Sequence, residues 1–291
     1  MGGPSYSFQS RSARTEDYKS KSMNDIFEQN IKRTAHTSMI PALKENKAHL
    51  RESRDSEAHP NSVPIIITLD ITGSMGSIPE NLIKTGLPTM VAKLKELGVE
   101  SPHILIIAVG DSRRDNNNGV FQLGQFEGGD KEMDMWLERI WISEGGGGNG
   151  SESYNWAYYY ALNHVQTDAW DKRKQKGFIF TIGDDHCQPN LTKAELDEVM
   201  GYLSKGESVD TEKIVEDLRE KWKMFHIELG SCKDSWSRLI GSQNVVEMKR
   251  NDYEGIAKQI ATLVAENVIP SSSTIVTPVK EEEDKPFKIT L

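Results

Sequence analysis

The sequence predicts an α/β fold in which helices cover both faces of a doubly wound, mostly parallel open sheet. Three strongly apolar runs, "IIITL", "ILIIAV" and "GFIFTI", support this prediction. Such runs are typical of strands that are buried on both faces. Segments of helical length separate the runs, and this alternation of strand and helix is typical of a parallel sheet.

Six strands and six helices are predicted from residue 64 onward. The strands are Pro64–Leu69, His103–Val109, Val120–Phe126, Gly177–Ile182, Met224–Leu229 and Val245–Met248. The helices are, approximately, Pro79–Leu97, Lys131–Ile142, Glu152–Gln166, Thr192–Leu203, Thr211–Trp222 and Asp252–Val268. The third strand follows the second after an Asn-rich turn, "DNNNG", which favours a hairpin and therefore an antiparallel edge strand. Thr192 and Glu195 have the spacing of a capping box, so a helix is expected to begin there.

The chain is divided into three parts by its composition. Residues 1–62 are predicted to form an N-terminal helical arm and a charged connector, residues 63–269 the α/β domain, and residues 270–291 a disordered tail rich in Ser, Pro and Glu. Residues 1–21 are polar and are expected to lack regular structure. An apolar helical face follows, and we expect it to pack on the body because nothing in the arm covers it: Met23, Ile26, Phe27 and Ile31. A second helix is expected to include Met39, Ile40, Leu43 and Leu50.

Charge and cysteine content argue against several classes of protein. The net charge is −9, which argues against non-specific binding of nucleic acid. The first 60 residues carry a small excess of positive charge, so the arm and the acidic body should attract each other. The two cysteines, Cys187 and Cys232, do not make a disulfide framework, which predicts a reducing, cytoplasmic location. No apolar segment predicts a signal peptide or a membrane span.

Oxygen-bearing side chains follow two of the predicted strands. The first strand ends in Asp70, Thr72 and Ser74, and the fourth ends in Asp184 and Asp185. A glycine-rich loop, "SEGGGGNGSESY", adds two further oxygen ligands, Asn149 and Ser151. Ligands of open α/β sheets bind beyond the carboxyl ends of the strands, so these groups are expected to converge. Carboxylate, hydroxyl and amide oxygens suit Mg²⁺, Mn²⁺ or Ca²⁺.

Other interpretations of these segments have less support. Asp185, His186 and Cys187 form a run that could bind zinc, but the sequence shows no spaced set of Cys and His partners. The glycine-rich loop is not a phosphate-binding P-loop, because no Gly-Lys-Ser/Thr follows it. His226 lies in a predicted buried strand and is expected to be a core residue. The tyrosines of the helix after the glycine-rich loop are expected to pack in the core or at an interface: Tyr154, Tyr158, Tyr159 and Tyr160.

The segment Asp70-Ile-Thr72-Gly-Ser74 resembles the D-x-[ST]-x-S signature of von Willebrand factor A (vWA) domains, and the chain looks most similar to their bacterial and phage members. In that family the signature forms a metal-ion-dependent adhesion site (MIDAS). The resemblance implies that Asp70, Thr72 and Ser74 hold the metal. It places Asp184 at the third metal loop, with Asp185 as the open alternative. At the second loop it implies Asn149 by position or Ser151 by chemistry.

The resemblance implies a binding module rather than an enzyme. A partner protein would complete the metal coordination with an Asp or Glu, and bacterial members are often associated with AAA+ ATPases of the MoxR type. The alternative is a Mg²⁺-dependent phosphatase of the haloacid dehalogenase type, with Asp70 as the nucleophile. That chemistry usually needs a second carboxylate two residues later as the general acid, and this sequence has Thr72 there.

Overall fold

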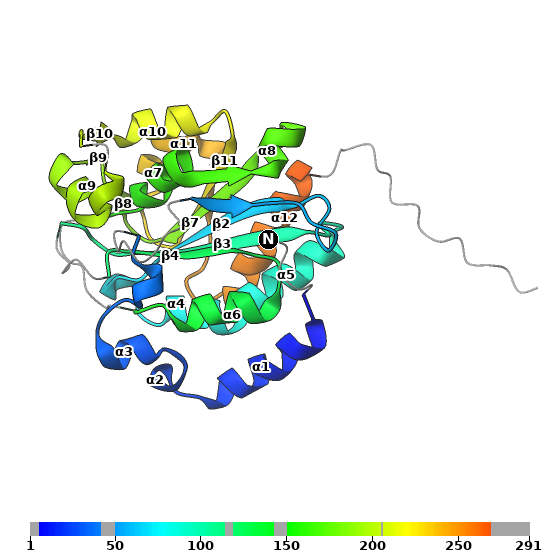
Figure 1. The fold of residues 1–291 in the computed structure, drawn as a ribbon. Coiled ribbons are helices and arrows are strands. Elements are labelled where there is room, and N and C mark those ends of the chain that lie inside the picture. The colour runs from blue at the N-terminus through cyan, green and yellow to red at the C-terminus, as the bar shows by residue number, and fades with distance from the viewer. Residues whose placement is uncertain (1–5, 42–49, 114–118, 143–149, 205, 269–291) are drawn as a thin grey trace, which may run out of the picture.

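The computed structural model describes residues 6–41, 50–113, 119–142, 150–204 and 206–268 (Figure 1). A six-stranded sheet forms its centre, in the order β12-β11-β7-β2-β3-β4. In chain order the strands are β2 (Val63–Asp70), β3 (Pro102–Val109), β4 (Phe121–Glu127), β7 (Gly177–Gly183), β11 (Trp222–Glu228) and β12 (Val245–Glu247). All neighbours are parallel except β4, which runs antiparallel to β3 at one edge. The predicted fold class is therefore confirmed, together with all six strands.

Helices cover both faces of the sheet, which explains the continuous apolar runs. One face carries α4 (Ile78–Asn81), a π-helical turn (Leu82–Gly86), α5 (Leu87–Glu96), α6 (Asp130–Glu138) and α12 (Tyr253–Val268). The other carries α7 (Asn155–His164), α9 (Lys193–Val199), α10 (Thr211–Leu218) and α11 (Lys233–Ile240). Successive residues of β2 point to opposite faces: Ile65 and Ile67 pack in one core and Ile66 in the other. Every residue of β2 is buried as a result.

Several local predictions need correction. The helix predicted to reach Gln166 ends at His164, because residues 165–167 form strand β6 (Val165–Thr167). Strand β6 pairs in parallel with β1 (Arg51–Ser53), which lies within the predicted charged connector. Within the α/β domain, α8 (Asp168–Arg173) and α11 were not predicted. The capping box at Thr192 is present, with both of its hydrogen bonds.

The N-terminal arm contains a helix where the sequence predicted none. Residues Phe8–Ser20 form α1, and the arm continues through α2 (Met23–Ile26) and α3 (Glu28–Lys32). Figure 1 shows α1 lying along the outer side of α6. The predicted docking is confirmed for Ile26 and Phe27, which are buried, but it is wrong for Ile31, which is 68% exposed. Of the second predicted helix, Met39 ends a short 3₁₀ helix (Thr37–Met39), Ile40 has extended backbone, and residues 42–49 lie outside the described residues. The side chain of Met23 and the tail from residue 269 lie outside them as well.

Charged side chains fasten α1 to α6. Buried Arg11 pairs with Asp134, and Arg14 pairs with both Asp130 and Asp134. The three contact residues of α1 are spaced i, i+3 and i+7, and those of α6 are spaced i, i+4 and i+8, so each set lies on one helical face: Arg11, Arg14 and Tyr18 against Asp130, Asp134 and Glu138. The expected attraction between the arm and the body therefore takes the form of specific ion pairs.

Candidate functional site

The predicted oxygen ligands of the first and third loops meet at the centre of the sheet. Asp70 is the last residue of β2, and Asp184 directly follows β7. These strands are adjacent, and the chain leaves β2 toward β3 on one side but later returns to place β7 on the other. In open α/β sheets, such a reversal of strand order marks the place where ligands bind, beyond the carboxyl ends of the strands. The fold itself thus brings Asp70 and Asp184 to the same edge.

Asp70 is fully buried and hydrogen-bonded through both oxygens. Its Oδ1 accepts hydrogen bonds from the Thr72 backbone N–H at 2.8 Å and from Thr72 Oγ1 at 2.6 Å. Its Oδ2 accepts one from the Tyr154 hydroxyl at 2.6 Å. Burial raises the pKa of Asp70 to about 6, and the negative charge of Asp184 adds to the shift, although the bonds from Thr72 and Tyr154 oppose it. Burial thus destabilises the ionised form of Asp70, and a bound cation would stabilise it.

A line of oxygens leads from Asp70 to the surface. Thr72 Oγ1 lies 3.3 Å from Ser74 Oγ, and Ser74 Oγ donates a hydrogen bond to Asp184 Oδ1 at 2.9 Å. Thr72 is 3% exposed, whereas Ser74 is open to solvent. Of the two neighbouring carboxylates, Asp184 therefore faces the first loop. The hydroxyls of Thr72 and Ser74 lie between the buried Asp70 carboxylate and the solvent. This arrangement is expected of a cation site that is open only on its solvent side.

Tyr154 belongs to this site, although the sequence predicted only a packing role for it. Its ring is buried at the start of α7, and its hydroxyl reaches Asp70. The approach passes close to Gly183: a Cβ atom at that position would lie 1.8 Å from the Tyr154 hydroxyl oxygen. A glycine is therefore required immediately before Asp184. Through this hydrogen bond α7 supports the buried end of the site.

Arg250 is the second residue that the sequence did not predict. It lies between β12 and α12, and its Nη1 donates a hydrogen bond to Asp184 Oδ2 at 2.7 Å. Its Nη2 donates to the backbone carbonyl of Ser74. The guanidinium is thus held beside the carboxylate and hydroxyl groups by two loops. No motif in the sequence around Arg250 could have identified it.

The second predicted loop is described only in part. Asn149 lies outside the described residues. Ser151 opens the short strand β5 (Ser151–Glu152), which pairs in parallel with β8 (His186–Cys187). In this register Ser151 lies opposite His186. The end of the glycine-rich loop is therefore joined to the segment that directly follows the two aspartates.

The chemistry of these donors fits a hard divalent cation. Two carboxylates and two hydroxyls supply only oxygen, which Mg²⁺, Mn²⁺ and Ca²⁺ prefer. One of these carboxylates, Asp184, already pairs with a positively charged group, the guanidinium of Arg250. The phosphatase alternative fits poorly, because Asp70 is 0% exposed with both oxygens engaged, and a hydroxyl stands at position 72 where that chemistry needs an acid.

The residues expected to be core are core. His226 is fully buried, its ring stacks on Trp236 with a centroid distance of 3.8 Å, and its Nδ1 lies 2.8 Å from Thr181 Oγ1. Burial lowers the pKa of His226, so the neutral imidazole is favoured. Tyr158, Tyr159 and Tyr160 are buried as well.

No protein-family model matches the sequence, and no curated protein matches it. Solved structures match at low identity. Proximal thread matrix protein 1 from the mussel byssus is 12% identical, with 70% of this chain and 46% of that chain covered and a TM-score of 0.45. The pilus adhesin SpaC from Lactobacillus rhamnosus GG is 10% identical, with 75% and 32% covered and a TM-score of 0.46.

A further structure of the mussel protein, described as having a zinc-occupied MIDAS motif, is 10% identical, with 73% and 48% covered and a TM-score of 0.44. The chain spans less than half the length of each of these structures. Such low identities and TM-scores do not carry a function from one protein to another. Within the described residues, no helix is both long and apolar enough to cross a membrane.

Proposed function

We propose that this chain is a metal-dependent protein-interaction module. Thr72 and Ser74 would bind the cation directly through their hydroxyl groups. The carboxylates of Asp70 and Asp184 would bind it directly or through water. The second loop would complete the site with Asn149 or Ser151. The observation that carries the proposal is the continuous line of oxygens from buried Asp70 through Thr72 and Ser74 to Asp184.

When bound, the divalent cation would supply a positively charged, open coordination position. Few negative charges of the site would offset the charge of the cation, because Thr72 and Ser74 are neutral and one oxygen of Asp184 already pairs with Arg250. An added anion is therefore favoured at this position. A side-chain carboxylate on a folded partner fits better than a free anion, since the body of the protein is acidic and repels free anions. The partner would thus present an Asp or Glu.

The finer parts of the proposal come from the family resemblance in the sequence. They are a bacterial or phage origin and a partner such as an AAA+ ATPase of the MoxR type. The proposed cytoplasmic location is supported instead by the two-cysteine composition, which favours a reducing compartment. A module of this kind needs no catalytic group.

Metal binding is tested by urea unfolding with and without Mg²⁺ or Mn²⁺. A hundredfold excess of the ion over its Kd should raise the free energy of unfolding by about 2.7 kcal/mol. Asp70→Ala and Thr72→Ala should abolish the increase. Thr89→Ala is the matched control. The Thr89 hydroxyl donates a hydrogen bond to the backbone carbonyl of Thr85, one turn earlier in the same helical segment. An unchanged increase in the Asp70 and Thr72 variants would refute the metal site.

Partner binding is tested by pull-down in Mg²⁺, repeated with EDTA and with Thr72→Ala. Proteins captured by the wild type in Mg²⁺ should be lost under both conditions and kept by Thr89→Ala. The partner's carboxylate is then found by Asp→Asn and Glu→Gln substitution on that protein. A partner that survives both EDTA and Thr72→Ala would show an ordinary interface that the metal does not control.

A further inference from the structure

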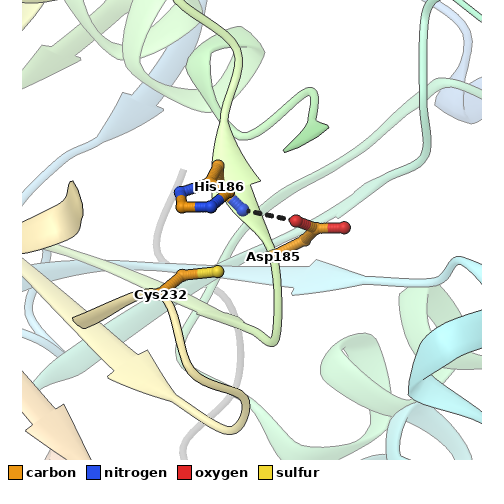
Figure 2. Close-up of side chains that lie close together, drawn as sticks. All are labelled: Asp185, His186 and Cys232. Carbon is orange, nitrogen blue, oxygen red and sulfur yellow. Dashed lines mark hydrogen bonds between the residues drawn. The ribbon is translucent and has the colours of Figure 1, made fainter. Parts of the chain in front are cut away.

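A second group of metal-binding side chains lies next to the candidate site and is not part of it. Figure 2 shows Asp185, His186 and Cys232 gathered in one place. One ligand atom of each lies within 4.8 Å of the others. Asp185 and His186 follow β7, and Cys232 follows β11 immediately before α11. Since β7 and β11 are parallel neighbours, their carboxyl ends bring the three together.

These three donors differ in chemistry from the first site. They offer a thiolate, an imidazole and a carboxylate, whereas the first site offers only oxygens. Sulfur and nitrogen ligands select Zn²⁺ over Mg²⁺ or Ca²⁺. Three protein ligands leave one position of a tetrahedral zinc ion open to water or to a partner. The ligand set therefore points to zinc rather than to a second hard cation.

The geometry is close to that of a bound ion. In a tetrahedral zinc site with bonds of about 2.0–2.3 Å, the ligand atoms lie roughly 3.5 Å apart. The cluster needs to contract by little more than 1 Å from its 4.8 Å limit. His186 is exposed and Asp185 is partly exposed, so both side chains have room to turn toward the buried Cys232. Asp185 Oδ1 accepts the His186 backbone N–H at 2.8 Å, and a carboxylate has a second oxygen for an ion.

The loops that carry the cluster are fixed to each other without an ion. Trp236, which is buried in α11, donates its Nε1–H to the backbone carbonyl of Asp185 at 3.0 Å. The Cys232 thiol donates a weak hydrogen bond to the Asp184 carbonyl at 3.7 Å. Two contacts therefore tie the Cys232 segment to the Asp184–Asp185 backbone. This framework holds the backbone segments that carry Asp185 and Cys232 beside each other.

We propose that Asp185, His186 and Cys232 bind Zn²⁺ at a site distinct from the one at Asp70. The run Asp185-His186-Cys187 has no spaced Cys or His partner in the sequence, and the fold supplies Cys232 from the end of a different strand. Cys187 is not a member of the cluster, although it is adjacent to His186 in the sequence. Asp184 and Asp185 thus serve two different ions from consecutive positions.

The test uses Co²⁺ as a spectroscopic substitute for Zn²⁺ on the full chain. A thiolate ligand gives Co²⁺ a charge-transfer absorption in the near ultraviolet, which oxygen ligands alone do not give. The wild type should develop this band with one equivalent of Co²⁺, and Zn²⁺ should displace it. Cys232→Ser should lose the band, whereas Cys187→Ser is the matched control and should keep it. Thr72→Ala, which disables the first site, should also keep it.

If circular dichroism shows that Cys232→Ser does not fold, a second variant, His186→Ala, still tests the proposal. His186 is exposed, so His186→Ala should fold and should weaken Co²⁺ binding by more than about tenfold, because even a lost outer-sphere partner commonly costs that much. Absence of the band from the wild type would overturn the proposal. The same holds if the band persists in folded Cys232→Ser, if His186→Ala binds Co²⁺ as tightly as the wild type, or if Cys187→Ser or Thr72→Ala abolishes the band.

Discussion

Replacing Tyr154 with phenylalanine removes one hydroxyl from behind the candidate metal site and leaves its ring in place. That hydroxyl is the donor to Asp70 Oδ2 at 2.6 Å, and Asp70 is 0% exposed, so water cannot easily replace it. A hydrogen bond to a charged group is worth about 1.5–3 kcal/mol, and full burial favours the upper half of that range. The free energy of unfolding should therefore fall by about 2–3 kcal/mol.

The same substitution should weaken metal binding. The Tyr154 hydrogen bond lowers the pKa of Asp70, so its loss should raise that pKa further above about 6 and leave less carboxylate to attract the ion. Loss of a partner that orients a metal ligand typically weakens binding by about 10–100-fold. Urea unfolding measures the stability of the variant, and isothermal titration calorimetry with Mg²⁺ measures its affinity.

Tyr158→Phe is the matched control. It changes the same type of residue on the same helix and in the same core, but its hydroxyl has only a 3.5 Å contact with Thr181. It should leave the affinity for Mg²⁺ unchanged. If Tyr154→Phe and Tyr158→Phe have the same affinity for Mg²⁺, the bond between Tyr154 and Asp70 does not support a metal ligand, and the reasoning fails.

Three further predictions concern other contacts. Arg11→Ala should cost about 3 kcal/mol in urea unfolding because it breaks a buried ion pair, whereas exposed Lys19→Ala should cost well under about 1 kcal/mol. Burial, aided by the neighbouring imidazole of His59, lowers the pKa of His103 to about 4. The unfolded chain therefore binds more protons between pH 6.5 and 4, so the wild type should lose about 3 kcal/mol of stability as the pH falls through that window, and His103→Gln should lose less. Gly183→Ala should displace the Tyr154 hydroxyl, reduce stability by about 1–3 kcal/mol and share the metal defect of Tyr154→Phe.

Each of these predictions has a result that contradicts it. Equal unfolding free energies for Arg11→Ala and Lys19→Ala would mean that the ion pair does not fasten the arm. A slope of stability against pH that is identical in the wild type and His103→Gln would remove His103 as its cause. Wild-type Mg²⁺ affinity in Gly183→Ala would show that the glycine is not needed for the approach of Tyr154.

The sheet could be predicted because strands that are buried on both faces have continuous runs of apolar residues. Neighbouring residues such as Ile65 and Ile66 are both apolar since each faces a different helical layer. Strand-end residues could be predicted to share an edge because parallel strands end on the same side of a sheet, and the structure shows that β2 and β7, which lead to Asp70 and Asp184, are neighbours. Both inferences need only the order of the elements. Neither needs the contacts of any single side chain.

Helix α1 of the arm was missed because its contact face is polar. A search for apolar periodicity cannot find α1, whose contacts with α6 are made by Arg11, Arg14 and Tyr18. A search for complementary charge at helical spacing would have found the two faces. The roles of Tyr154 and Arg250 could not be predicted for another reason. Each depends on a single long-range hydrogen bond, from Tyr154 to Asp70 and from Arg250 to Asp184, and no pattern in the neighbouring sequence indicates it.

The contacts of the candidate metal site join parts of the chain that are far apart in sequence. Ser74 and Asp184 are 110 positions apart, Tyr154 and Asp70 are 84 apart, and Arg250 and Ser74 are 176 apart. Loops of this length must close before such contacts form, so they are expected late in folding. An ion held there would stabilise the native state but not the folding transition state. Bound metal should therefore leave the folding rate unchanged and slow unfolding, lengthening the lifetime of the native protein.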